Sequence, residues 1–308
     1  MAKVLITGGA GFIGRHCARE FLDAGWEVRL FDCMPVEEED PLVKSGCSVQ
    51  NGDVRDEQAV ERAMEDCDAI VHLAAVVSVP QSMEDPDETM DINVRGTRNI
   101  LNASQRLNLS HVIIASSAAV YGEHGTMPLD EAAKIEPFSP YGESKVRNEK
   151  DVVRARKEGL NAIALRFFNV YGPNQSNASG YASLIPLFVE KMIRGEQPQI
   201  HGDGLQSRDF IHVSDLANAI VKLSTLSECF PIPVANVATQ TQTSVLDIFE
   251  TINEHLTLTH HYDSVQPQFI SPRAGDITHS CGSNARLKST IDWLPNVDLN
   301  DGLRKLID

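Results

Sequence analysis

The chain has 308 residues, of which 42% are hydrophobic, and a formal net charge of -16. This length and apolar content suit one large or two ordinary folded domains and exclude a wholly disordered chain. No run of 18 apolar residues occurs, which excludes a membrane span, and the excess of acidic residues disfavours nucleic acid as a partner.

The amino terminus and the cysteines bear on the compartment in which the chain works. The first apolar run is too short for a signal peptide, so we expect a cytoplasmic location. The six cysteines include no CxxC pair, which indicates reduced thiols. The adjacent His260 and His261 lack further ligands at zinc spacing, and we therefore expect no metal site.

Short apolar segments alternate with helical patterns along the first half of the chain. Buried strands are expected at residues 3–7, 27–31, 48–50, 69–73, 112–115 and 162–166. Helices are expected at residues 14–24, 57–65, 88–107 and 143–157. Strands that alternate with helices predict an α/β fold, a Rossmann-type doubly wound parallel sheet with right-handed connections.

The alternation weakens near residue 172, where a loop rich in glycine, asparagine and serine begins. Residues 1–172 are therefore expected to form a Rossmann domain that binds a dinucleotide. Residues 173–308 are expected to form mainly a smaller lobe that binds the substrate, and we leave open that some of its segments return to the first domain. A ligand is expected in the cleft at the carboxyl ends of the strands.

A glycine-rich motif, GGAGFIG at residues 8–14, follows the first strand and opens the first helix. Gly8 permits the tight turn, Gly11 lets the backbone approach a pyrophosphate, and Gly14 lets the helix pack closely on the strand. The helix start at Phe12 and Ile13 offers free N–H groups to phosphate. The motif therefore predicts a dinucleotide-binding site.

Two acidic residues follow the next strands. Asp32 ends the second strand, where a carboxylate accepts hydrogen bonds from the adenosine ribose and repels a 2′-phosphate, which favours NAD over NADP. Asp53 follows the third strand and is a candidate to accept from the adenine amino group, with Val54 beside the ring. The alternative is that Asp53 only caps the next helix.

The segment YGESK at residues 141–145 carries the chemistry. A spacing of four places Tyr141 and Lys145 on one face of a helix, where the ammonium is expected to lower the pKa of the phenol. Tyr141 then becomes a proton shuttle for a hydroxyl and carbonyl pair. Ser116 and Ser117 end the fifth strand, from which a serine can hydrogen-bond the same substrate oxygen.

Further motifs extend along nearly the whole chain, namely HLAA at 72–75, DINV at 91–94, RFFNVYGP at 166–173, GDG at 202–204, RDFIHV at 208–213 and PRAGD at 272–276. With those above, they resemble the extended short-chain dehydrogenase/reductase family. The resemblance is strongest to nucleotide-sugar 4-epimerases of the UDP-galactose 4-epimerase type.

The resemblance implies roles for residues at matching positions. Ser117, Tyr141 and Lys145 match the catalytic set, and the implied cofactor is NAD. The further residues implied for the cofactor are Leu73, Ala74, Ala75, Asn93, Ser116 and Phe168. The residues implied for the nucleotide part of the substrate are Asn169, Leu184, His201, Arg208, Arg273 and Asp276.

Two differences between this sequence and related members of the family refine the expected reaction. Related 4,6-dehydratases carry acidic residues after the fifth strand, whereas Ala118 and Ala119 stand here, so elimination of water is disfavoured. Ser280 occupies a place where a large aromatic residue narrows the hexose pocket in the family. The small side chain implies a wider pocket that accepts 2-acetamido sugars, and the alternative is a solvated loop serine.

The expected function is interconversion of UDP-gluco and UDP-galacto sugars through a 4-keto intermediate, with tightly bound NAD. The alternatives are a UDP-glucuronate 4-epimerase or decarboxylase, another nucleotide-sugar epimerase or reductase, and a non-catalytic NAD-binding sensor. The family often forms dimers through paired helices, and the helices expected at 88–107 and 141–157 are candidates for such a homodimer.

Overall fold

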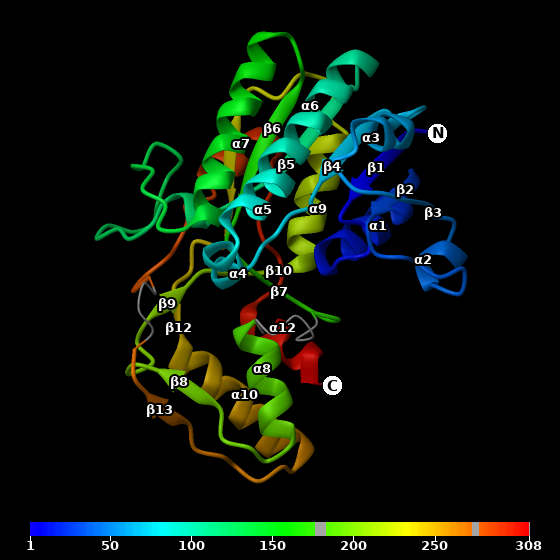
Figure 1. Cartoon of the computed structure of the whole chain (residues 1–308). Helices are drawn as coiled ribbons and strands as arrows, with labels where there is room; N and C mark the ends of the chain where they lie inside the picture. Colours follow the sequence, from blue (N-terminus) through cyan, green and yellow to red (C-terminus); the bar gives the residue numbers. More distant parts are fainter. Residues whose placement is uncertain (176–182, 273–276, 308) are drawn as a thin grey trace.

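Seven parallel strands form the central sheet, in the order β3-β2-β1-β4-β5-β6-β11 (Figure 1). Their bounds are β1 (Lys3–Thr7), β2 (Glu27–Asp32), β3 (Ser48–Asn51), β4 (Ala69–His72), β5 (His111–Ser117), β6 (Ala162–Phe167) and β11 (Val234–Val237). This is the Rossmann strand order with one strand added, which confirms the predicted fold class. The computed structural model describes residues 1–175, 183–272 and 277–307.

Helices cover both faces of this sheet. One face carries α1 (Phe12–Asp23), α9 (Val213–Ser224) and α11 (Ala285–Ile291), and the other carries α3 (Glu57–Met64), α6 (Gly96–Leu107) and α7 (Pro140–Lys157). In β1, Val4 and Ile6 pack into the first apolar layer, and Leu5 packs into the second. Burial on both faces explains why these strands are almost continuously apolar in sequence.

The helix expected at residues 88–107 is instead three consecutive segments. They are α5 (Pro86–Met90), a π-helical turn (Asp91–Arg95) and α6. Within the π turn, the Asn93 carbonyl accepts a hydrogen bond from the Thr97 hydroxyl at 2.6 Å, and the Asn93 side chain bonds to groups of other elements. A π turn inserts one residue into the helical repeat, so it re-aims this side chain, and apolar periodicity does not reveal it.

The second lobe lies below the sheet in Figure 1. It contains α8 (Leu184–Ile193), β8 (Gln199–His201), β9 (Ser207–Arg208), β12 (Thr243–Ser244), α10 (Val245–His260), β13 (Gln268–Ile270) and α12 (Leu299–Ile307). Its separate apolar core includes Phe188, Ile248 and Leu303. Two short parallel strands, β7 (Asn169–Tyr171) and β10 (Phe210–His212), join the lobes.

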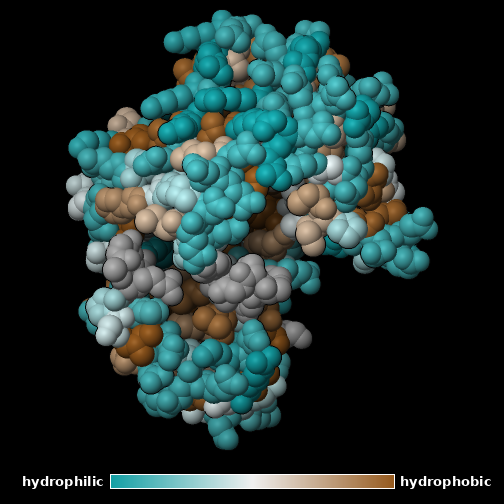
Figure 2. All heavy atoms as spheres, in the orientation of Figure 1, coloured by the Kyte–Doolittle hydropathy of each residue, from teal (hydrophilic) through white to brown (hydrophobic). Residues whose placement is uncertain are grey.

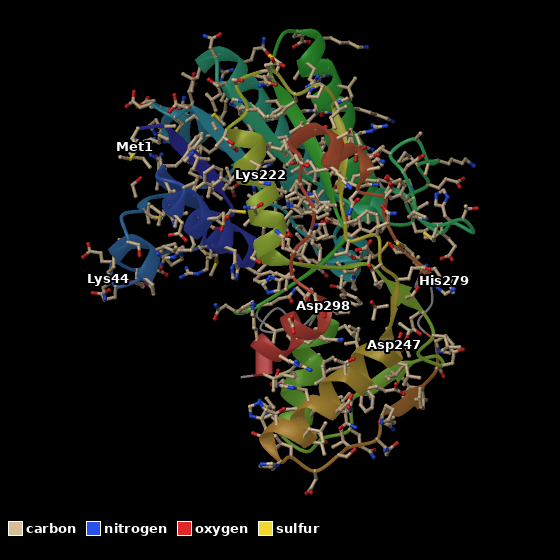
Figure 3. The ribbon with its side chains drawn as sticks, turned by 180° about the vertical axis from the view of Figure 1, so that it is seen from behind. Met1, Lys44, Lys222, Asp247, His279 and Asp298 are labelled. Carbon is tan, nitrogen blue, oxygen red and sulfur yellow. The ribbon has the colours of Figure 1, made fainter. Side chains whose placement is uncertain are left out.

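Parts of the chain beyond residue 172 belong to the first lobe in space. Strand β11 pairs with β6, and α9 packs on α1. Seen from behind, α9, marked by Lys222, crosses the sheet, whereas Asp247 marks α10 in the other lobe (Figure 3). The remaining short elements are α2 (Pro41–Lys44), α4 (Val79–Glu84) and a 3-10 turn (Ala118–Val120).

All six cysteines are free thiols. Across the three described stretches of chain, no helix combines the length and apolar character needed to cross a bilayer.

Candidate active site

The turn between β1 and α1 has the shape of a phosphate cradle. Gly8 has φ of +68°, and a Cβ there would lie 2.9 Å from the Ala74 amide nitrogen. A Cβ on Gly14 would overlap the Gly8 carbonyl oxygen. Gly11 caps α1 without a side-chain hydrogen bond, which leaves the first N–H groups of the helix available. These features fit the pyrophosphate of a dinucleotide.

Asp32, at the end of β2, lines the same cavity as the glycine-rich turn. Its carboxylate accepts hydrogen bonds from the amides of Ala10 and Met34, both at 3.0 Å, which fix its orientation. A carboxylate oxygen has more than one acceptor site, so these bonds leave capacity for ribose hydroxyls.

Asp53 has a partner that the sequence did not suggest. Its carboxylate is bound by the Arg55 guanidinium, with Oδ2 to Nη2 and Nε distances of 2.6 and 3.0 Å. The hydrogen bond from Arg55 lowers the pKa of Asp53. The alternative role as a helix cap is wrong, because Asp56 caps α3. Contact with adenine stays a prediction, and Arg55 lines the same cavity.

Tyr141 and Lys145 lie on the buried face of α7, beside the end of β5. The Lys145 Nζ donates to the Ala115 carbonyl at 2.9 Å and lies 5.7 Å from the Tyr141 ring centroid. Burial lowers the pKa of Lys145 to about 8. Burial also raises the pKa of Tyr141, and a hydrogen bond with the Ser117 side chain opposes that rise.

The expectation that Lys145 lowers the pKa of Tyr141 is therefore wrong for the protein without its cofactor. The ammonium is engaged by the Ala115 carbonyl, and the phenol is largely buried, so the cost of removing the phenolate from water dominates. A positive charge brought next to Tyr141 by a bound ligand would favour the phenolate.

A buried polar network supports this region from behind. His72 lies between the hydroxyls of Thr7 and Thr97, at 2.7 and 3.0 Å, and burial lowers its pKa to about 3, so it is neutral. The Asn93 amide group accepts from the Val76 N–H at 2.8 Å and donates to the Ser144 hydroxyl at 3.0 Å. Asn93 thus holds the loop after β4 against α7.

One cavity of about 1150 Å³ joins the cradle, Asp32 and the Tyr141 region. The residues predicted for the cofactor that line it are Gly8, Gly11, Phe12, Ile13, Gly14, Asp32, Asp53, Val54, Leu73, Ala74, Ala75, Ser116, Tyr141, Lys145 and Phe168. Ser117 lines it as well, whereas Asn93 lies behind the wall. The dimensions and the cradle fit a dinucleotide such as NAD.

A second cavity, of about 570 Å³, lies in the smaller lobe. Four residues predicted for the substrate line it, namely Asn169, Leu184, His201 and Arg208. Val170, Gln175 and Ser183 line both cavities, so the two meet. The surface is hollowed between the lobes, and apolar side chains show inside the hollow (Figure 2).

Three other substrate predictions have different outcomes. Arg273 and Asp276 lie outside the described residues. Ser280 is only 8% exposed, so the alternative of a solvated serine is wrong. The described residues that line the two cavities do not include Ser280. Its backbone N–H donates to the Ser207 carbonyl at 3.0 Å, next to Arg208.

Sequence reasoning missed several residues that shape the site. Ser144, Glu149 and Arg166 all lie within motifs or helices that had been singled out, but only their contacts show their importance. Within the described stretches, no group of three or more His, Cys, Asp or Glu side chains could hold a metal ion.

The fold and this site define a dinucleotide-binding α/β protein with a tyrosine and lysine pair at the reactive end of the cavity. Residues 4–232 match the family described as the NAD dependent epimerase/dehydratase family. The chain belongs to this family and has the extended short-chain dehydrogenase/reductase fold. The family assignment confirms the prediction of NAD as cofactor.

Relatives match over nearly the full length. The UDP-glucose 4-epimerase of Lactobacillus helveticus is 31% identical over 96% of this chain and 94% of its own. The structure of the UDP-N-acetylglucosamine 4-epimerase of Methanobrevibacter ruminantium, in complex with UDP-N-acetylmuramic acid, is 33% identical, with a TM-score of 0.91 and coverage of 99% and 97%. The structure of the Thermotoga maritima UDP-glucose 4-epimerase with UDP-glucose is 30% identical, with a TM-score of 0.90 and the same coverage.

Proposed function

We propose that this chain is a nucleotide-sugar 4-epimerase that interconverts UDP-gluco and UDP-galacto sugars and retains NAD through the cycle. One observation carries the proposal. Tyr141, Lys145 and Ser117 line the dinucleotide cavity, and this cavity shares Val170, Gln175 and Ser183 with the second cavity. A sugar whose nucleotide occupies the second cavity would then present its ring to Tyr141. The named relatives support the same class of reaction.

Bound NAD would supply a hydride acceptor at C4 of the sugar and a positive charge near Tyr141. Tyr141 removes the proton of the 4-hydroxyl and later returns it to the 4-keto sugar, after the sugar has turned its other face. Ser117 donates to or accepts from the same oxygen and so orients it. Lys145 would keep a positive charge beside the phenol and would help to hold the ribose of NAD nearest the reacting carbon.

The nucleotide diphosphate is proposed to lie along Asn169 and Arg208. The guanidinium of Arg208 donates to the carbonyl of Ser207 at 2.9 Å, which fixes it at the cavity wall. A planar guanidinium suits two phosphate oxygens and counters the overall acidity of the chain. His201 and Leu184 border the part of the cavity assigned to the base. Arg273 and Asp276 are proposed from their motif alone.

We also propose that N-acetylated sugars are accepted. The likeness to a UDP-N-acetylglucosamine 4-epimerase supports this, and the small Ser280 is proposed to contribute from the family resemblance alone. Elimination of water has no candidate acid or base beside Ser117, since Ala118 and Ala119 follow it.

We also propose that the protein is a cytoplasmic homodimer. Pairing through α6 and α7 is proposed from the family resemblance, since Leu107 and Val153 are single exposed apolar residues of a kind that monomers also have. Light scattering of the purified protein tests this, since a monomeric mass at micromolar concentration would contradict it.

Proton NMR of the purified protein with nucleotide sugars, and with no NAD added, tests the function. We expect galacto-configured anomeric signals from UDP-N-acetylglucosamine and from UDP-glucose. Turnover of UDP-glucose alone would keep the reaction but refute the wider pocket. Turnover of UDP-glucuronate alone, or loss of CO₂ from it, would replace the proposed substrate. Bound NAD without turnover of any of these would support the non-catalytic alternative.

A further inference from the structure

Three consecutive residues at the end of β5 contact three residues of α7. The Ala115 carbonyl accepts from Lys145 at 2.9 Å, the Ser116 hydroxyl donates to Glu149 at 2.6 Å, and Ser117 hydrogen-bonds Tyr141. The helix residues are spaced by four, so they lie on one face. Three contacts therefore hold α7 against the end of β5, and the Glu149 contact is the farthest of the three from Tyr141.

Glu149 is itself fixed by a forked ion pair. Its two oxygens accept from the Nε and Nη2 atoms of Arg166 at 2.8 and 2.7 Å. Arg166 lies on β6, directly opposite Ser116 in the register of the sheet. Glu149 is 7% exposed and Arg166 is 3% exposed, so the pair is inside the protein.

Arg166 extends the network beyond the pair. Its Nη1 donates to the Tyr121 hydroxyl at 2.8 Å, and its guanidinium carbon lies 4.7 Å from the Tyr121 ring centroid. The Tyr121 hydroxyl in turn donates to the Asn236 side chain on β11 at 2.7 Å. Four elements, α7, β5, β6 and β11, thus share one network behind the reactive end of the cavity.

We propose that Glu149, held by Arg166, is a positioning residue that sets the register of α7 against the end of β5 and so fixes the Tyr141 and Ser117 hydroxyls for proton transfer. A buried ion pair contributes little net stability compared with apolar residues of the same size, because both charges lose water. Each hydrogen bond that Glu149 accepts comes from a residue of β5 or β6. This geometry indicates that Glu149 aligns α7 with these strands rather than adding stability. This inference rests on the proposed function only where it predicts an effect on kcat.

The placement predicts which kinetic constant changes. Among the described residues, neither Glu149 nor Arg166 lines either cavity. Replacing Glu149 should therefore spare substrate affinity and slow the chemical step. A misplacement of about 1 Å between reacting groups costs up to about 100-fold in rate.

The variant Glu149→Gln keeps the size of the side chain and one acceptor for Ser116, but weakens the fork to Arg166. We expect kcat to fall about 10-fold to 100-fold, with KM within about threefold of wild type. The matched control is Asp151→Asn, on the same helix. Asp151 is 5% exposed and ion-paired with Arg98 at 2.7 Å. Asp151 pairs with Arg98 and Arg154 rather than with β5, so this control should keep wild-type kcat.

A second variant, Ser116→Ala, removes the contact between β5 and Glu149 without changing charge. It should lower kcat in the same direction even if Glu149→Gln fails to fold. A readout independent of catalysis is ¹⁹F NMR of 3-fluorotyrosine protein, with the Tyr141 signal assigned by Tyr141→Phe. Both variants should shift or broaden that signal, and Asp151→Asn should not.

The outcomes separate the two proposals. Unchanged kcat and an unchanged Tyr141 signal in Glu149→Gln and Ser116→Ala would overturn the positioning role. So would an equal loss of kcat in Asp151→Asn, which would indicate general destabilisation. If wild-type protein epimerises no nucleotide sugar, the proposed function fails, and the ¹⁹F signals still decide whether Glu149 positions Tyr141.

Discussion

Lys145 should cost the protein stability, because its ammonium is buried and donates to the Ala115 carbonyl, and no carboxylate among the described residues forms an ion pair with it. A pKa lowered from 10.5 to about 8 corresponds to about 3 kcal/mol of destabilisation at neutral pH. Lys145→Met removes this penalty and forfeits the hydrogen bond to the Ala115 carbonyl, worth about 1 kcal/mol. The variant should therefore be more stable than wild type by about 2 kcal/mol at pH 7 and catalytically inactive.

The pH dependence of stability independently checks the predicted stabilisation by Lys145→Met. Between pH 8 and 10.5 the unfolded chain still binds a proton at Lys145 that the folded chain has lost, so wild-type stability rises with pH in this window. The gain in Lys145→Met should be largest below pH 8, should reach zero at about pH 10, and should become a loss of about 1 kcal/mol above pH 10.5, where only the lost hydrogen bond remains. Urea unfolding of protein stripped of cofactor measures both. The exposed Lys150→Met is the control and should change stability little. A destabilised Lys145→Met at pH 7, or a gain independent of pH, would refute the reasoning.

Three further predictions concern other parts of the site. Tyr141→Phe should lower kcat by at least about 100-fold while the protein still purifies with NAD, and full turnover measured by NMR would contradict the proton-shuttle role. Gly14→Ala should abolish NAD retention, because the new Cβ would overlap the Gly8 carbonyl, whereas Gly125→Ala, with open space around it, should retain NAD as judged by absorbance after denaturation. As pH falls from 6.5 toward 3, the unfolded chain binds a proton at His72 that the folded chain does not bind, so stability falls. In His72→Gln, the free energy of unfolding measured with urea should depend on pH with a slope shallower by up to one proton. An unchanged slope would contradict burial of a neutral imidazole.

The sheet and the dinucleotide cradle were predictable from sequence because local rules determine them. Gly8 and Gly14 occupy positions where a side chain would collide with the backbone, so the motif fixes its own geometry. Each strand of the first half falls within one or two residues of its predicted bounds, since buried parallel strands are short apolar runs.

Features that depend on contacts between distant segments were not predictable in the same way. In the π turn, the Asn93 side chain reaches Val76 and Ser144, and neither contact leaves a periodic signal in the sequence. The partner of Asp53 is Arg55, only two residues away, yet a choice between helix cap and ion pair requires side-chain positions. The pKa of Tyr141 also depends on enclosure, which spacing within a helix cannot report.

The second lobe was the least predictable part. Its strands have two or three residues each, too few for a period to appear, and β11 returns to the main sheet after a long excursion. Ser280 illustrates the limit for substrate choice. Its burial is clear, but its position relative to a sugar follows only from the resemblance.

The most direct test of the proposed reaction follows the hydrogen at C4. UDP-N-acetylglucosamine carrying deuterium at C4 is incubated with the purified protein in ordinary water, with no NAD added, and the product is examined by NMR and mass spectrometry. Return of the same hydride to the opposite face predicts a galacto-configured product that retains deuterium at C4. Loss of the deuterium to solvent, or a product that retains deuterium but is altered at another carbon, would contradict 4-epimerisation by this route.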